Sequence, residues 1–234
     1  VLARGAVRVF TGFSGAVSFF PPGRAEFTGN PVRAEIVAAA GERSDSFPPG
    51  TPFTVLALGG SQGARAINSR VVGMARRAKR EGRSIRFLLQ TGEREHGAIA
   101  EAVRAEGLPV EAFPFTERIG DMFSRCHAVL MRAGALSIAE AALFGRPCVL
   151  IPYPYAADRH QARNAAEFCA AGAGSWMPEG EATEEAVWNA LWALGGNREA
   201  RERAGTAALS FARPQAAADT VRRALRLAGR ACDV

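Results

Sequence analysis

Three short segments of glycine, small and polar residues have the types and spacing needed to bind a phosphorylated ligand. The first, residues 59–64 (GGSQGA), lies between an apolar run and a helical pattern. Glycines let the backbone approach a ligand closely, and the unpaired N–H groups at a helix N-terminus suit a phosphate. The segment matches neither the GxGxxG fingerprint nor the phosphate loop that ends in Gly-Lys-Ser/Thr. It is therefore either a phosphate-binding turn or a plain glycine turn between a strand and a helix.

The second segment, residues 132–140 (RAGALSIAE), also follows an apolar run and opens a predicted helix. Its small residues and Ser137 suit a diphosphate at the helix N-terminus. Glu140 has two interpretations. It closes a capping box with Ser137, three residues earlier, or its carboxylate accepts hydrogen bonds from the two hydroxyls of a ribose.

The third segment, residues 152–161 (PYPYAADRHQ), is followed by Asn164. Its prolines favour an extended loop, and Asp158 is the predicted N-cap of the next helix. Gln161 and Asn164 share a helix face, and their amides both donate and accept, as sugar hydroxyls require. His160 is either a general base or an ordinary surface or packed histidine.

Arg33 ends a fourth segment, residues 28–33 (TGNPVR), in which Asn-Pro predicts a turn. An arginine at the exit of a turn between domains can face a cleft and bind a phosphate. The three segments that follow predicted strands indicate a nucleotide site of the kind that binds a nucleotide sugar, and the fourth adds only a weak indication. The residues alone leave open whether its ligand is a nucleotide sugar or another nucleotide.

The elements that must position these segments follow a regular pattern from residue 53 onwards. Continuous apolar runs alternate with helical stretches, which predicts an α/β fold with a doubly wound, Rossmann-like parallel sheet and helices on both faces. Such sheets bind ligands at the carboxyl ends of their strands, where three of the segments lie. The predicted strands are 53–58, 85–90, 110–113, 128–131, 148–151 and 175–177, and the predicted helices are 64–80, 94–106, 119–125, 136–144 and 159–171.

Composition narrows the function classes. The net charge is +6, and Lys79 is the only lysine. This arginine bias reflects either a GC-rich genome or an affinity for anions. No basic run is interleaved with aromatic residues, so no nucleic-acid partner is predicted. The arginines at 4 and 8 interrupt the apolar opening stretch, so it predicts no membrane span.

The four cysteines, Cys126, Cys148, Cys169 and Cys232, form no CxxC pair and no cluster with zinc spacing. They are predicted to be free thiols, and neither a metal nor a cofactor is expected. From Thr183 onwards the chain is predicted to be helical. In its last helix an ordinary packing stripe is predicted, formed by Val221, Ala224, Leu225 and Ala228.

The order and spacing of the motifs resemble the MurG family of glycosyltransferases. The matching motifs are TGNPVR, GGSQGARAIN, QTG at 90–92, PF at 114–115 and RAGALSIAEAALFGRPCVLIPYPYAADRHQARNA at 132–165. The resemblance implies the GT-B architecture, in which two Rossmann-like domains face each other across a cleft. It further implies that residues 1–29 are a remnant of the N-terminal acceptor domain, that 30–213 form the UDP-sugar-binding domain, and that 214–234 form a helix that packs back on the N-terminal domain.

The resemblance also implies roles for individual residues. Arg33 and Ser61 would lie near the diphosphate, and Thr116 would contact the uracil, although an apolar residue is common at that position. Gln161 would contact the sugar, with Asn164 and His160 beside it. Glu140 would bind the ribose at the end of a run that lines the nucleotide, formed by Ala135, Leu136, Ser137, Ile138, Ala139 and Glu140. The family's glycine-rich loop ending in histidine has no match here, so the catalytic residues are expected in the N-terminal domain.

The implied reaction is an inverting transfer of N-acetylglucosamine from UDP-N-acetylglucosamine to the undecaprenyl-pyrophosphoryl-N-acetylmuramoyl-pentapeptide lipid of peptidoglycan synthesis. It implies a cytoplasmic protein that lies peripherally on the inner face of the membrane and meets an anionic lipid surface. This chain alone is expected to bind the donor with little turnover.

Three alternatives remain. The chain is a non-catalytic UDP-sugar-binding module that works with a separate acceptor chain, or a GT-B transferase for another lipid acceptor. A dinucleotide-dependent oxidoreductase is disfavoured, because no acidic residue follows a GxGxxG at the required distance.

Overall fold

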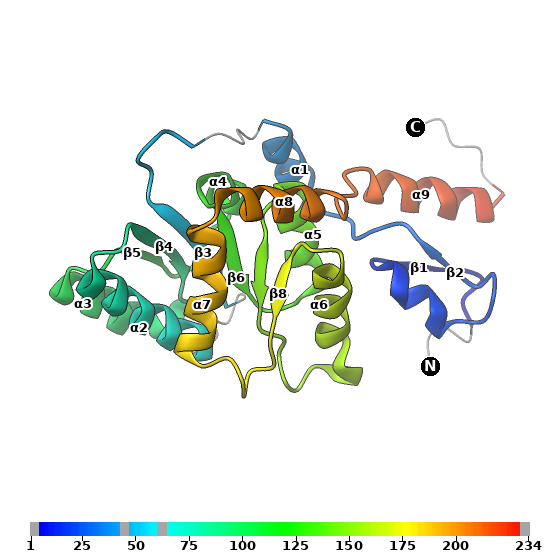
Figure 1. The fold of residues 1–234 in the computed structure, drawn as a ribbon. Coiled ribbons are helices and arrows are strands. Elements are labelled where there is room, and N and C mark those ends of the chain that lie inside the picture. Colours follow the sequence, from blue (N-terminus) through cyan, green and yellow to red (C-terminus); the bar gives the residue numbers. More distant parts are fainter. Residues whose placement is uncertain (1–4, 43–46, 60–64, 230–234) are drawn as a thin grey trace.

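A six-stranded parallel sheet forms the centre of the protein (Figure 1). The computed structural model describes residues 5–42, 47–59 and 65–229. The strand order is β5-β4-β3-β6-β7-β8, and every neighbouring pair is parallel. The strands are β3 (Phe53–Leu58), β4 (Ile85–Gln90), β5 (Val110–Phe113), β6 (Ala128–Met131), β7 (Cys148–Leu150) and β8 (Gly174–Trp176).

The strand order reverses between β3 and β6. The chain first moves outwards from β3 through β4 to β5, then returns to the other side of β3 and continues through β6 to β8. At such a switch point the loops after the two central strands diverge to opposite faces, and a crevice opens between them at the carboxyl edge. The segment that follows β6 therefore lies at this crevice, as does Gly59, the first residue of the segment that follows β3; residues 60–64 lie outside the described part of the chain.

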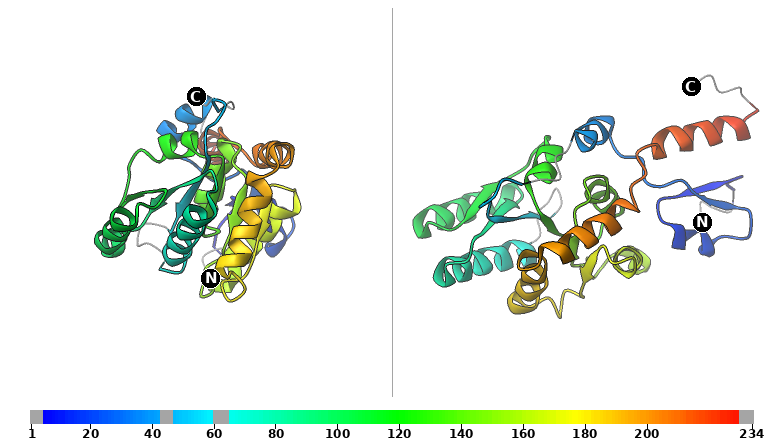
Figure 2. Two further views of the ribbon diagram at one scale, coloured as in Figure 1. Left: turned by 60° about the vertical axis from the view of Figure 1, so that its left-hand side comes forward. Right: turned by 45° about the horizontal axis from the view of Figure 1, so that its top comes forward.

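Helices cover both faces of the sheet, as Figures 1 and 2 show. On one face α2 (Arg65–Glu81), α3 (Glu93–Glu106) and α7 (Glu184–Gly195) pack over one hydrophobic cluster. On the other face a second cluster is covered by α1 (Ala34–Gly41), α4 (Ile119–Arg125), α5 (Ala135–Leu143), α6 (His160–Ala170) and α8 (Arg198–Leu209). All six residues of β3 and all four of β6 are buried, because both faces of these central strands are covered. The predicted doubly wound α/β fold is confirmed.

The predicted elements between residues 53 and 177 are all present within the described part of the chain, with ends that agree or differ by one residue. One local prediction is wrong. Asp158 is not the N-cap of α6, because it lies inside a short 3-10 helix, η3 (Ala157–Arg159), with a positive φ of 51°. The following residue, Arg159, is the N-cap of α6, and its side chain makes no capping hydrogen bond.

Residues 5–30 and the last helix lie together beside the sheet domain (Figures 1 and 2). Strands β1 (Val9–Thr11) and β2 (Ala25–Phe27) pair in parallel and are joined by the 3-10 helix η2 (Ser14–Phe19). Helix α9 (Ala216–Leu227) contacts this pair through a 3.1 Å hydrogen bond from Thr220 to Thr28 and an ion pair between Arg223 and Glu26. We call β1, η2, β2 and α9 the end unit.

The described residues do not cover the predicted packing stripe of α9. The side of α9 that contacts the β1–β2 region carries Thr220 and Arg223. The apolar stripe lies outside these contacts. Val221 is therefore 52% exposed, Ala224 and Ala228 are exposed as well, and Leu225 is only half-buried.

Three cysteines, Cys126, Cys148 and Cys169, are free thiols, as predicted, and burial raises the pKa of each; Cys232 lies outside the described residues. Among the helices that the structure describes, none is long and apolar enough to span a membrane.

Candidate functional site

A cavity of about 770 Å³ opens at the carboxyl ends of the central strands. It is lined by the ends of β3, β4 and β6 and by the loops that follow them. Five residues predicted from the sequence line it together: Arg33, Thr116, Ser137, Glu140 and Gln161. They come from four separate stretches of the chain, since Ser137 and Glu140 both lie in α5. Those that follow strands of the parallel sheet meet at one edge because the carboxyl ends of its strands lie there. Gly59 also lines the cavity, whereas Ser61 lies outside the described residues.

Helix α5 begins beside this cavity and decides between the two interpretations of Glu140. Its N-cap is Gly134, so Ser137 already lies within the first turn and cannot be the N-cap of a capping box. The capping-box interpretation is therefore wrong. Glu140 lies in the next turn, lines the cavity, and makes no hydrogen bond or ion pair to another described residue.

The surroundings of Glu140 leave its carboxylate partly desolvated and able to bind a polar ligand. Burial raises the pKa of its carboxyl group, and the positive charge of Arg33 opposes this rise. Arg33 itself is exposed and pairs with Glu35 at 3.3 Å. A partly desolvated carboxylate gains more from hydroxyl donors than one that is fully hydrated. Glu140 can thus accept the two hydrogen bonds of a diol.

The two amides predicted to bind a sugar differ in their surroundings. Gln161 lines the cavity, and its Oε1 accepts a hydrogen bond from the backbone N–H of Tyr153 at 2.9 Å. Its amide nitrogen is therefore the group left to meet a ligand. Asn164 instead donates from Nδ2 to the carbonyl oxygen of Ala133 at 3.2 Å, and so braces the loop between β6 and α5.

His160 lies at the exposed start of α6. Its Nδ1 lies 2.8 Å from the carbonyl oxygen of Ala157, which fixes the proton on Nδ1. It does not line the cavity, so its role as an ordinary surface histidine is favoured. Leu136, in the first turn of α5, is 53% exposed outside the cavity lining.

Ile138 and Ala139 line a different, smaller cavity of about 210 Å³ on the side of α5 that faces the end unit. Ile138 is also part of the buried core. Ala135 packs against that core, and its carbonyl accepts a hydrogen bond from Asn30 Nδ2 at 3.4 Å. Of the predicted α5 residues, Ser137 and Glu140 are thus the two whose side chains reach the large cavity.

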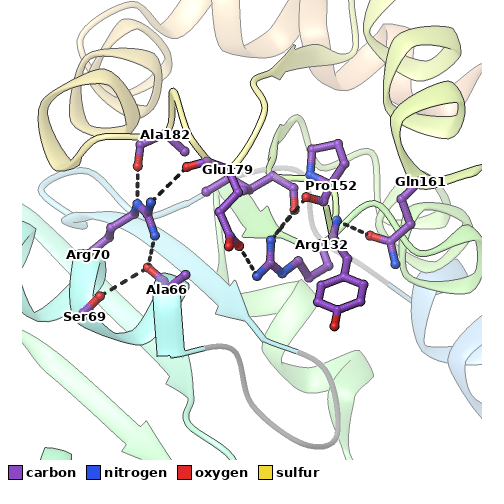
Figure 3. Close-up of polar contacts among 10 residues, drawn as sticks. Ala66, Ser69, Arg70, Arg132, Pro152, Gln161, Glu179 and Ala182 are labelled. Atoms are coloured by element: carbon purple, nitrogen blue, oxygen red, sulfur yellow. Dashed lines mark hydrogen bonds and ion pairs between the residues drawn. The ribbon is translucent and has the colours of Figure 1, made fainter. Parts of the chain in front are cut away.

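Several lining residues were not assigned roles from the sequence. Phe115 is 53% exposed next to Thr116 and presents a ring to the cavity. An aromatic residue two positions after the end of β5 is the feature of the sequence that could have identified it. Arg132 and Glu179 form an ion pair in the cavity wall (Figure 3). No pattern in the sequence joins these two residues, because the pair forms between a strand end and a distant turn.

Comparison with known proteins agrees with this geometry. Residues 54–220 match the model of the glycosyltransferase family 28 C-terminal domain. The chain belongs to this family. UDP-N-acetylglucosamine–N-acetylmuramyl-(pentapeptide) pyrophosphoryl-undecaprenol N-acetylglucosamine transferase from Geotalea daltonii is 36% identical over 187 residues, which are 80% of this chain and 51% of that protein. The transferase of the same name from Nitratidesulfovibrio vulgaris is 38% identical over 225 residues, which are 94% of this chain and 60% of that protein.

The fold comparison gives the same result. The crystal structure of Acinetobacter baumannii MurG superposes with a TM-score of 0.75 at 26% identity, over 95% of this chain and 61% of that one. The chain is therefore a MurG-like family 28 C-terminal domain with the fold of GT-B glycosyltransferases, and this domain implies a UDP-sugar donor. The chain spans about half to three-fifths of the length of these relatives.

Proposed function

We propose that this chain binds UDP-N-acetylglucosamine in the large cavity and serves as the donor half of an inverting N-acetylglucosamine transferase of peptidoglycan synthesis. The observation that carries the proposal is that Glu140, Gln161 and Arg33, from three different stretches, line one cavity at the switch point of the sheet. A carboxylate, an amide N–H donor and a guanidinium match a ribose, a sugar hydroxyl and a diphosphate respectively. The relatives named above carry this transferase name.

In the proposed complex the nucleotide lies along the start of α5. Glu140 accepts hydrogen bonds from the ribose hydroxyls, and Ser137 and the first-turn amides of α5 meet the diphosphate. Phe115 offers its exposed ring to the base, and the backbone at Thr116 meets the edge of the base. Gln161 donates to a hydroxyl of the sugar.

The proposed reaction is a single displacement at C1 of N-acetylglucosamine. The C4 hydroxyl oxygen of the acceptor muramoyl sugar forms the new bond as the bond from C1 to the diphosphate oxygen breaks. The acceptor proton passes to a general base, and UDP leaves with the bonding electrons. Charge grows on the leaving diphosphate, where Arg33 and the N-terminal end of α5 would stabilise it.

The acceptor, its general base and the site of action are also proposals that follow from the family. The acceptor is the undecaprenyl-linked muramoyl-pentapeptide, and we assign its binding and the general base to an acceptor domain. A lipid-linked acceptor would keep the whole enzyme at the cytoplasmic face of the membrane, beside anionic lipid. We expect this chain alone to bind the donor and to turn over little.

Calorimetric titration of the purified chain with UDP-N-acetylglucosamine tests the proposal. UDP-glucose, UDP-N-acetylgalactosamine and NAD, titrated separately, are the control ligands. Glu140→Ala should weaken donor binding by about tenfold to a hundredfold, the value of hydrogen bonds to one charged group. Glu101→Ala, an exposed glutamate on α3, is the matched control and should bind like the wild type. A folded chain that binds no UDP-sugar, or that binds NAD in preference, would contradict the proposal.

A further inference from the structure

Two arginines converge on the turn that follows β8 (Figure 3). Arg70 in α2 donates hydrogen bonds to the carbonyl oxygens of Ala182 and Glu179, the latter at 3.2 Å. Arg132, at the end of β6, forms an ion pair with the side chain of Glu179. Glu179 is therefore held by its backbone from one side and by its carboxylate from the other. This fixes its position relative to α2 and to the end of β6.

The ion pair lies largely out of the solvent. The side chains of Arg132 and Glu179 are 15% and 29% exposed, so water and salt screen their attraction less than on an open surface. Removal of one partner would leave a mostly buried charge without an opposite charge beside it, and this would destabilise the folded chain. The guanidinium of Arg132 therefore depends on Glu179 to stay where it is.

Arg132 in turn holds the loop that follows β7. Its Nη1 donates to the carbonyl oxygens of Ile151 and Pro152 at 3.2 and 3.3 Å. Its guanidinium carbon lies 5.6 Å from the centre of the Tyr153 ring. One side chain thus fixes three consecutive residues of this loop.

The next contact of this loop is with the side-chain amide of Gln161, which lines the cavity. The backbone N–H of Tyr153 donates to Oε1 of Gln161 at 2.9 Å. Because a backbone N–H can only donate, the side-chain atom that meets it must be the oxygen of Gln161. The amide nitrogen of Gln161 is left for the cavity, which Gln161 lines.

We propose that Glu179 is a positioning residue for the donor sugar, which acts through Arg132, the loop 151–153 and the orientation of Gln161. The inference rests on the proposed function, in which Gln161 donates to a sugar hydroxyl. In this proposal Glu179 affects binding of the sugar and not of the nucleotide. The residues proposed to bind the nucleotide, Glu140, Ser137 and Arg33, do not depend on its contacts for their positions. Loss of Glu179 should therefore weaken the sugar contact and leave the UDP contacts intact.

Calorimetric titration of the full chain with UDP-N-acetylglucosamine and with UDP separates these two contributions. We expect Glu179→Ala to lose about tenfold in affinity for the UDP-sugar, the upper end of the value of one neutral hydrogen bond, and less than about twofold for UDP. Glu179→Gln keeps the size of the side chain but removes the charge that pairs with Arg132, so it should recover only part of the loss. Glu181→Ala, an exposed glutamate of the same turn, is the matched control and should leave both affinities unchanged.

The outcomes separate the inference from the proposed function. A wild-type chain that binds neither ligand overturns both together. If the wild type binds both ligands, equal losses for UDP and the UDP-sugar in Glu179→Ala, or no loss, overturn the inference alone. If thermal melting shows that Glu179→Ala does not fold, Glu179→Asp, shorter by one methylene, must show the same selective loss, and its absence overturns the inference.

Discussion

The sheet domain and the end unit of this protein differ in how they bury apolar surface. In the sheet domain, helices on both faces enclose two clusters of side chains with almost no exposure. In the end unit, Phe19, Val221 and Leu227 are 61%, 52% and 47% exposed. The sheet domain is therefore stabilised by its own hydrophobic core. The apolar surface of the end unit is left uncovered by the described part of the chain.

Polar contacts connect the end unit to the sheet domain. The carboxylate of Glu167 on α6 accepts hydrogen bonds from the backbone N–H groups of Ser14 and Gly15, at 3.0 and 3.1 Å, which satisfies the start of η2. These contacts are exposed, and exposed polar contacts contribute little net stability. The same kind of substitution should thus have very different effects in the two regions.

The largest effect is expected at the centre of the sheet. Leu130 in β6 has no solvent exposure. Leu130→Ala should destabilise the chain by about 2–5 kcal/mol, because the change removes buried apolar contacts and leaves a cavity. Urea unfolding followed by circular dichroism measures this loss, and Leu130→Met, which keeps the volume, should cost less than about 1.5 kcal/mol. A loss below 1 kcal/mol for Leu130→Ala, an order-of-magnitude threshold, would show that the sheet is not the main source of stability.

Acid should destabilise the sheet domain through His127, at the start of β6. Burial, followed by the charges of Arg201 and Arg146, lowers the pKa of His127 from 6.5 to about 4. The unfolded chain takes up this proton near pH 6.5, whereas the folded chain resists it until about pH 4. Stability should therefore fall as the pH drops from 6.5 to 4, by up to about 3 kcal/mol.

Urea unfolding at several pH values between 7 and 4 checks this loss. His127→Gln removes the titrating group and should flatten the pH dependence, while His160→Gln, at an exposed histidine, should leave it unchanged. An equally steep acid loss in His127→Gln would show that other groups are responsible.

The contact between the two regions should give a smaller, local effect. Glu167→Gln replaces a charged acceptor for the amides of Ser14 and Gly15 by a neutral one, at a cost of about 1 kcal/mol. Hydrogen exchange of these two amides should accelerate by about fivefold, while that of the β3 amides stays constant. Exchange that accelerates equally in β3 would mean that the end unit and the sheet domain unfold together.

The smallest effect is expected on the exposed side of the end unit. Leu227→Ala makes the same chemical change as Leu130→Ala, but at a side chain that is 47% exposed. It should change the free energy of unfolding by less than about 0.5 kcal/mol in the same urea titration. A loss comparable to that of Leu130→Ala would contradict the contrast between the two regions.

The sequence predicted the sheet domain well because its signals are local. A strand buried on both faces is almost entirely apolar, as Phe53–Leu58 is apart from Thr54, and glycine often follows where the chain turns into a helix. The stripe of α9 carried the same kind of signal, yet the described residues leave it exposed. Periodicity identifies an apolar side of a helix but does not identify what covers it.

The candidate site was predictable for the residues that follow strands in short motifs. Glu140 and Gln161 were found in this way, and both line the cavity. The hydrogen bond by which Asn164 holds the loop before α5 was not predicted, because its acceptor is a backbone carbonyl 31 positions earlier. Glu179 was missed for a similar reason, since its partner Arg132 comes from a different strand.

Local patterns in the amino-acid sequence were enough to predict the strands and helices, the family, and the residue types at the edge of the sheet. These follow from the alternation of apolar and polar residues and from short motifs, which depend on neighbours along the chain. The folded chain was needed to show which of these residues share the cavity, that Gln161 presents its amide nitrogen, and that the described residues leave the apolar side of α9 exposed. Those outcomes depend on contacts between residues far apart in the chain, and a hydrogen bond or an ion pair is set by distance in space.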